Sequence, residues 1–182
     1  MAESFVNSLT RAAGIMTSYD SCTVGAISTS ITVSANTGIA VSDLVDNGNF
    51  LQGTKVTQIS GTTIYTDLTS TNTASSTTQT VKFLGMTTAY TASDKSILIG
   101  GTFANNTDSS VNLTVEIFDQ SVGVTTTGGS VALASKIPVP NGSSFVISDA
   151  GKTVLETSDE LRVYCDTNDA VDVSLGILKG VS

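Results

Sequence analysis

The chain has 182 residues, of which 40% are apolar and 13% are charged, and its formal net charge is −8. A chain of this length forms one large or two small domains. The abundance of Thr, Val, Ser and Gly favours pleated strands joined by turns, so the composition predicts a mostly β protein. The eight Lys and Arg residues are scattered singly, and no run approaches the roughly 18–20 apolar residues of a membrane span. We therefore expect neither a nucleic-acid partner nor a membrane partner.

Residues 1–24 are interpreted as an N-terminal arm or a first strand. Four apolar residues have near-helical spacing, but Gly14 and the Thr-rich continuation favour an extended chain. These four are Phe5, Leu9, Ala13 and Met16. The segment also lacks the basic start and apolar centre of a secretory signal, so export by the general pathway is not expected.

Residues 25–85 are predicted to form a small β module. Apolar and Ser/Thr residues alternate with a period of two over residues 27–33, as in a half-exposed strand. Residues 56–59 and 63–66 flank a Ser-Gly-Thr turn, which predicts a hairpin. The polar tract at residues 69–80 is interpreted as a long exposed hairpin loop.

Residues 86–182 are predicted to form an antiparallel β-sandwich, Ig-like or jelly-roll-like, because about seven short strands follow one another between turn signals. The clearest strand begins at Val111: one face carries Val, Leu, Val and Ile, and the other carries Asn, Thr, Glu and Phe. We expect the first face to cover the core and the second to face water. The fold class expected for the whole chain is therefore all-β, a sandwich with an additional small module near the N-terminus.

The relation between the two modules stays open at the level of sequence. The segments that begin at Met16 and Met86 both place a Tyr shortly after Met-Thr and lead into an apolar strand. Two arrangements explain this echo. Either the chain contains two related tandem modules, or the small module at residues 25–85 is inserted after the first strand of one sandwich.

Catalytic chemistry has few candidate groups in this sequence. The chain contains no histidine, which removes the most common general base, the Ser-His and Cys-His pairs and the most common metal ligand. Carboxylate pairs remain, and the candidates are Asp43 with Asp46 and Asp159 with Glu160. Neighbouring strand residues point to opposite faces, so the second pair is poorly placed to share a substrate. We expect no enzymatic activity and name no catalytic residue.

No cofactor or metal site is predicted either. The two cysteines, Cys22 and Cys165, lack the further ligands of a zinc site. A disulfide between them is conceivable, but Cys165 alternates with apolar residues and is better interpreted as a small buried hydrophobe. The segment at residues 166–172 superficially resembles a calcium loop, but Ala170 occupies a ligand position and no Gly follows. We interpret it as a tight turn between two strands.

The block at residues 86–178 resembles a family of small β-sandwich virion structural proteins of tailed phages, common in phages of marine bacteria and cyanobacteria. The similarity lies in the stretches SILIGGTFANNTDSSVNLTVEIFDQS, KIPVPNGSSFVI and KTVLETSDELRVYCDTNDAVDVSLGIL. The N-terminal stretch SFVNSLTRAAG is also similar to that family's N-terminal arm. The positions that match its Pro-rich corner and its following turn are Pro138, Pro140, Gly142, Ser143, Leu155, Glu156 and Asp159; Ser158 stands where the family often has Gly.

A second similarity concerns residues 31–66, which resemble a hairpin repeat of phage structural proteins. Asp43 and Leu44 depart from the Gly-Met that is usual there. Together these resemblances imply a virion component, assembled in the host cytoplasm, that acts by packing against other virion proteins (capsid, portal or neck, or tail) and against its own copies. They favour a head, neck or collar accessory or decoration protein.

The alternative function is a tail- or fibre-associated host-recognition module that binds surface glycan. Sugar sites are usually concave and carry stacked aromatic rings. Three tyrosines are the candidates for such stacking: Tyr65, Tyr90 and Tyr164. Each is also explained by ordinary packing within a strand, so the sequence does not favour this alternative.

Overall fold

The computed structural model describes residues 3–122, 129–148 and 153–181. In these residues the secondary structure is all β apart from one 3-10 turn, Gln120–Val122, which confirms the predicted fold class. None of the helical structure in this described part of the chain is long and apolar enough to cross a membrane. The strands form three antiparallel sheets, two of which belong to a sandwich.

The first sandwich sheet, called the terminal sheet, has the order β1-β15-β9-β12, and β13 also pairs with β9. The second, called the junction sheet, has the order β11-β10-β14-β8. Their strands are β1 (Ser4–Ala13), β8 (Thr87–Thr91), β9 (Ser96–Asn105), β10 (Val111–Phe118), β11 (Ser130–Val139), β12 (Ser144–Ile147), β13 (Thr153–Leu155), β14 (Glu160–Cys165) and β15 (Val171–Lys179).

The two sandwich sheets share one apolar core. Alternate side chains of β10, β14, β9 and β15 point inward and exclude water, as the period of two requires. The largest members are fully or almost fully buried: Phe103, Leu113, Leu161, Leu175 and Ile177. The predicted sandwich core at residues 86–182 is thus completed by β1, which pairs with β15 from Ser4↔Lys179 onward.

The remaining six strands form a small closed barrel with the order β4-β7-β2-β3-β6-β5. They are β2 (Ile15–Val24), β3 (Ser30–Thr32), β4 (Leu44–Asp46), β5 (Val56–Ser60), β6 (Thr63–Thr66) and β7 (Ser76–Gly85). The two ends of the sheet meet in a bridge between Leu44 and Lys55, and the Val45 N–H donates to the carbonyl of Thr54 at 2.8 Å. The closed barrel surrounds its own apolar core, which includes Ile31, Ile64 and Phe83.

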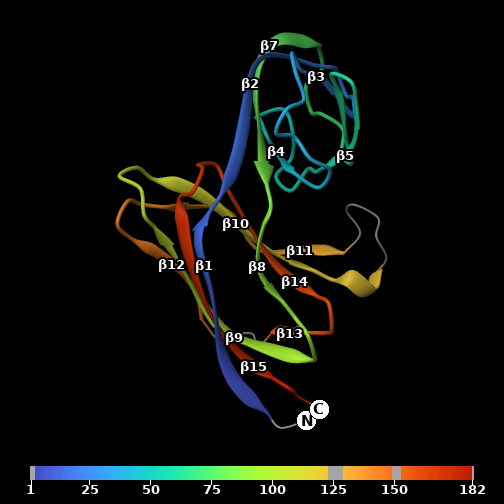
Figure 1. Cartoon of the computed structure of the whole chain (residues 1–182). Coiled ribbons are helices and arrows are strands. Elements are labelled where there is room, and N and C mark those ends of the chain that lie inside the picture. The colour runs from blue at the N-terminus through green and yellow to red at the C-terminus, as the bar shows by residue number, and fades with distance from the viewer. Residues whose placement is uncertain (1–2, 123–128, 149–152, 182) are drawn as a thin grey trace.

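The barrel lies between β1 and β8 in the chain, and both of these strands belong to the sandwich. The chain enters the barrel where β1 continues into β2 and leaves it where β7 continues into β8. Figure 1 shows β2 and β7 running side by side from the sandwich into the barrel. Two long antiparallel segments therefore pass through both modules.

The Pro-rich segment at residues 137–147 forms a corner between the two sandwich sheets. β11 ends at Val139 in the junction sheet, and β12 begins at Ser144 in the terminal sheet. Gly142 has a φ of 64°, and the Ser143 N–H closes the turn on the carbonyl of Pro140 at 3.2 Å. Pro138 lies in β11, an edge strand, which is where a sheet tolerates a residue without an N–H.

Three expectations from the sequence are wrong. Residues 76–80 of the polar tract belong to β7 and pair with β2, so the loop is shorter than predicted. The strand expected at residues 27–33 contains only Ser30–Thr32, and Ile27 adopts a φ of 45° outside it. The second face of β10 does not face water, because Glu116 is 3% and Phe118 is 6% exposed. Lys55 of the barrel covers Glu116, and Arg162 of β14 stacks on Phe118.

Gly14 is the single residue that connects β1 to β2. Its φ is +126°, which L side chains rarely adopt, and a Cβ added there would lie 2.3 Å from the backbone oxygen of Thr167. The Gly14 carbonyl accepts the Asp169 N–H at 3.0 Å, and the Ala13 carbonyl accepts the Ala170 N–H at 3.1 Å. The predicted tight turn between β14 and β15 is present, and it packs directly against this crossing point.

Gly14→Ala is expected to lower the free energy of unfolding by more than about 2 kcal/mol, because it combines an unfavourable φ with a clash against backbone. Gly61→Ala is the matched control: Gly61 also has a positive φ, +58°, but nothing lies within 4 Å of the added Cβ. Urea denaturation of both variants measures the difference. Equal losses for the two variants would contradict the close packing at Gly14.

Candidate functional site at the junction of the two modules

The carboxylates that the sequence singled out are engaged in separate structural contacts. Asp43, 4% exposed, accepts the Ala40 N–H at 2.8 Å, and burial raises the pKa of its carboxyl group although this hydrogen bond opposes the rise. Asp159, 5% exposed, accepts the N–H groups of Glu156 at 2.9 Å and Gln120 at 3.1 Å. These backbone contacts explain why both aspartates are buried.

The other two candidates each pair with a cation. The Asp46 carboxylate lies 2.7 Å from the Lys136 ammonium group, and the Glu160 carboxylate accepts the Arg162 Nε–H at 2.8 Å. Asp46 belongs to the barrel and Glu160 to the sandwich. No cluster of three or more Cys, Asp or Glu side chains with metal-binding geometry occurs among the described residues.

The two cysteines are both free and fully buried. Cys22 lies in the barrel core and Cys165 in the sandwich core, which confirms the interpretation of Cys165 as a buried hydrophobe. Burial raises the pKa of both thiols; a neighbouring aspartate charge adds to the rise, and backbone hydrogen bonds oppose it. Neither thiol therefore has the exposed, low-pKa character of a reactive cysteine.

The three tyrosines proposed for sugar stacking do not form a common surface. Tyr164 is fully buried, and Tyr90 packs partly against the sandwich core with its hydroxyl 3.2 Å from Ser96 Oγ. Tyr65 is 36% exposed on β6 of the barrel. The structure thus leaves one of the three rings open to a ligand.

The most unusual chemistry in the described residues is a buried ion pair between the modules. Lys55 of the barrel reaches Glu116 of the junction sheet, with Nζ 2.6 Å from Oε2. The two side chains are 3% and 4% exposed. The Lys55 ammonium also donates to Ser130 Oγ at 2.7 Å. A buried pair of this kind requires good geometry and additional hydrogen bonds to offset its desolvation, and both are present here.

A second buried cation, Arg162, lies beside this pair and has its own carboxylate partner, Glu160. Arg162 lies directly opposite Glu116 in the β10–β14 ladder, and it is 7% exposed. Its guanidinium stacks on the Phe118 ring at 3.6 Å and donates to Glu160. The Phe118 ring covers the face of the guanidinium group, and the N–H at the edge of that group donates to the Glu160 carboxylate. Arginine is suited to such an arrangement because its guanidinium group is planar.

Tyr164 fills the centre of the junction. It is fully buried and packs in a small apolar cluster with Leu44 and Leu84 of the barrel and with Met16. Its ring lies 5.7 Å from the Lys55 ammonium. Among the described residues its hydroxyl has no hydrogen-bond partner, and burial, followed by the nearby Glu116 charge, raises its pKa.

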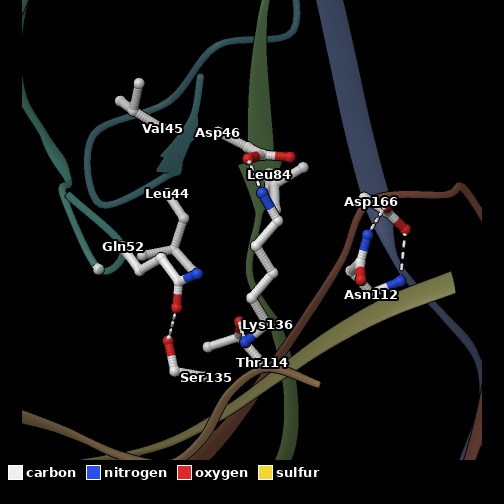
Figure 2. A pocket seen from close by; sticks show the side chains of 11 residues that line it. Leu44, Val45, Asp46, Gln52, Leu84, Asn112, Thr114, Ser135, Lys136 and Asp166 are labelled. Atoms are coloured by element: carbon white, nitrogen blue, oxygen red, sulfur yellow. Dashed lines mark hydrogen bonds and ion pairs between the residues drawn. The ribbon is translucent and has the colours of Figure 1, made fainter. Parts of the chain in front are cut away.

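A bulge in β11 supplies the outer contacts of the junction. Ser135 and Lys136 both lie opposite Thr114 in the β10 register, and Lys136 has a φ of 50°. Such a bulge redirects side chains: Lys136 reaches Asp46, and Ser135 reaches Gln52 at 3.3 Å. Figure 2 shows both contacts bridging the two modules.

A small hollow remains beside these contacts. Figure 2 shows its lining, which includes Leu44 and Leu84 of the barrel and the hydrogen-bonded pair Asn112 and Asp166 of the sandwich. Its volume is about 30 Å³, far below the roughly 300–1,000 Å³ of small-molecule sites. The described contacts hold the two modules together, and the hollow beside them is smaller than a typical small-molecule site.

Sequence reasoning missed this junction. Lys55 occurs in the stretch GTKVTQ, where it looks like an ordinary exposed strand residue, and Glu116 alternates on a face expected to be wet. A local pattern cannot reveal a partner 61 residues away. The one available signal was Phe118, an aromatic residue on the supposedly polar face of β10.

Comparisons with known proteins identify no family. No family model matches the chain, and no curated protein matches it. A crystal structure of hydroquinone 1,2-dioxygenase from Sphingomonas sp. TTNP3 with 4-hydroxybenzoate bound is similar at 16% identity and a TM-score of 0.17. The match covers 54% of this chain and 60% of that chain, and a TM-score this low does not indicate a shared fold or function.

Lys55→Met is expected to lower the free energy of unfolding by about 3–5 kcal/mol, because it leaves the buried Glu116 charge without its partner. Lys136→Met is the matched control, since Lys136 makes an inter-module ion pair of similar length with a side chain 40% exposed. Its expected loss is below about 1 kcal/mol. Chemical denaturation measures both values, and equal losses would contradict the special role of the buried pair.

The double variant Lys55→Met/Glu116→Leu is expected to recover much of that loss, since it removes both charges and fills similar volume. A double-mutant cycle on unfolding free energies gives the coupling between the two residues. A double variant as unstable as the sum of both single variants would show that the two side chains do not interact.

Both thiols are expected to be unreactive toward a thiol-specific disulfide reagent in the native protein and fully reactive in denaturant. The reason is their complete burial in two different cores. Spectrophotometric titration counts the groups released under each condition. Finding no free thiol after denaturation without reductant would instead indicate a disulfide.

Proposed function

We propose that this chain is a structural component of a tailed-phage virion that acts by protein–protein packing. A head, neck or collar accessory or decoration role is the preferred position. In this proposal the chain is assembled in the host cytoplasm, and its partners are other virion proteins and its own copies. The resemblance of residues 86–178 to small β-sandwich virion proteins gives the proposal its biological setting.

The observation that carries the proposal is that the buried ionisable groups at the junction pair with each other between the modules. Lys55 and Glu116 are buried and paired with each other across the contact between the modules. A binding or catalytic site places such groups beside a cavity. Here they fix the barrel to the sandwich, and a fixed shape is what a protein acting by packing needs.

The sheet edges support an assembly role as well. Ser8 Oγ and Thr10 Oγ1 of β1 donate to the Ala89 carbonyl of β8, so one pair of sandwich edges is tied together. On the other side, Pro138 lies in the edge strand β11. Protected edges limit uncontrolled strand addition, which matters for a protein present at high local concentration.

The glycan-binding alternative has less support. It requires rings grouped around a concave surface, whereas Tyr164 and Tyr90 pack inward and Tyr65 lies apart on the barrel. A glycan array with the purified chain tests it directly. Binding that is lost in Tyr65→Ala would favour the alternative over the packing role.

The proposed function is tested on purified particles of the phage whose genome encodes this chain. We expect mass spectrometry to find the chain in density-purified particles at a fixed ratio to the major capsid protein. Gold-labelled antibody against the chain should then mark the head or neck in electron micrographs. Particles that lack the chain, although lysates contain it, would overturn the proposal.

A further inference from the structure

The terminal sheet has one face in the sandwich core and one face, called the outer face, that points away from it. Val6 and Ser8 of β1 pair with Ile177 and Leu175, each 1% exposed, so these positions point inward. The alternating residues of β1 must point outward. Two of them are large and apolar: Phe5 is 79% and Leu9 is 74% exposed.

Other strands extend this apolar surface across the sheet. Val146 of β12 is 54% exposed and pairs with Thr102, and Val154 of β13 is 47% exposed and pairs with Ile97. Between them Gly176 pairs with Gly100, so the middle of the face carries no side chains. Exposed apolar residues gathered on one face mark an interaction surface more reliably than single ones do.

The strand positions of the outer face carry balanced charge although the chain carries a net charge of −8. In the described strands of the terminal sheet, its outward positions include one cation and one anion, Arg11 and Asp172, which line the same groove. Most faces of an acidic chain repel a second copy. A face with balanced charge can meet its own copy without that repulsion.

The face carries both a groove and a projecting side chain. A groove of about 290 Å³ lies beside Leu9 and is lined by Ala104 and Ser174 among others. Phe5 projects from the same strand, about 13 Å away along β1 at roughly 3.3 Å per residue. A two-fold axis crossing β1 near Asn7 would place Phe5 of each copy over the groove of the other.

The area also suits a dimer. The five strands of the terminal sheet contain 36 residues, which at about 3.3 Å per residue and about 4.8 Å between strands cover about 570 Å² per copy. Two such faces bury about 1,100 Å², above the roughly 1,000 Å² expected of a biological interface. Packed sheets with their strands nearly aligned are a common geometry for surfaces of this kind.

We infer that the outer face of the terminal sheet packs against the same face of a second copy, with Phe5 of each chain in the groove beside Leu9 of the other. This inference rests on the proposed assembly role for its biological setting, and it names the partner that this surface takes. The barrel, which lies against the junction sheet, stays free of the contact.

Sedimentation or light scattering of the purified full chain tests this inference. At about 10 µM, a concentration suited to a micromolar or tighter complex, we expect twice the 18.6 kDa mass of one chain. Leu9→Asp should weaken the dimer at least about 100-fold, because it buries an unpaired charge. Leu51→Asp is the matched control: Leu51 is 59% exposed in the barrel, and this variant should remain dimeric.

Two further variants keep the test decisive. Phe5→Ala removes the projecting ring without adding a charge, so it should weaken the dimer even if Leu9→Asp folds poorly. Asn7→Cys should be joined to its copy by a short bismaleimide cross-linker, whereas Thr78→Cys on the barrel should not. The natural cysteines do not interfere, because both are buried.

A wild-type chain that is monomeric at this concentration would overturn the inference, as would a dimer that Leu51→Asp disrupts as strongly as Leu9→Asp. A monomeric chain that is nevertheless found in particles, and is lost from them in Leu9→Asp, would assign the outer face to another virion protein. That result would leave the proposed virion role intact, whereas a dimeric chain absent from particles would leave the dimer intact and remove the role.

Discussion

The buried ion pair between Lys55 and Glu116 is the polar constraint that ties the barrel to the sandwich. It joins a side chain of the barrel to a side chain of the junction sheet at 2.6 Å, away from solvent. Charges in such a place strongly penalise any separation of the modules, because both would lose their partner before regaining full hydration. The pair therefore opposes separation of the modules, and the apolar contacts of Tyr164 with Leu44 and Leu84 keep water away from the junction.

The two sheets of the sandwich have different surroundings on their faces away from the core. The junction sheet turns its polar face to the barrel, and the terminal sheet leaves an apolar face of balanced charge uncovered by the described chain. The barrel and the outer face therefore lie on opposite sides of the sandwich core. We interpret the molecule as a rigid block with one face for self-association and a projecting barrel that is free for other contacts.

Much of the local structure was predictable from the sequence, because turn chemistry and the period of two are local signals. The hairpin closed at Ser60↔Thr63 and the corner at Pro140 to Ser143 both follow from such signals. The junction could not be predicted from the sequence, because the ion-pair partner of Glu116 is a lysine in the other module. The prediction for the polar tract was also wrong in part. Segments rich in Ser and Thr occur both in loops and in strands, and pairing with β2 places the end of this tract in β7.

Barrel and sandwich are expected to behave as one rigid unit, and native-state amide hydrogen exchange tests this most directly. The slowest amides of β2 and β7 in the barrel should open with the same free energy as those of β10 and β14, because separating the modules would expose the buried charges. Barrel amides that exchange through an independent opening, several kcal/mol less costly than that of the sandwich, would contradict this expectation and describe two modules on a hinge.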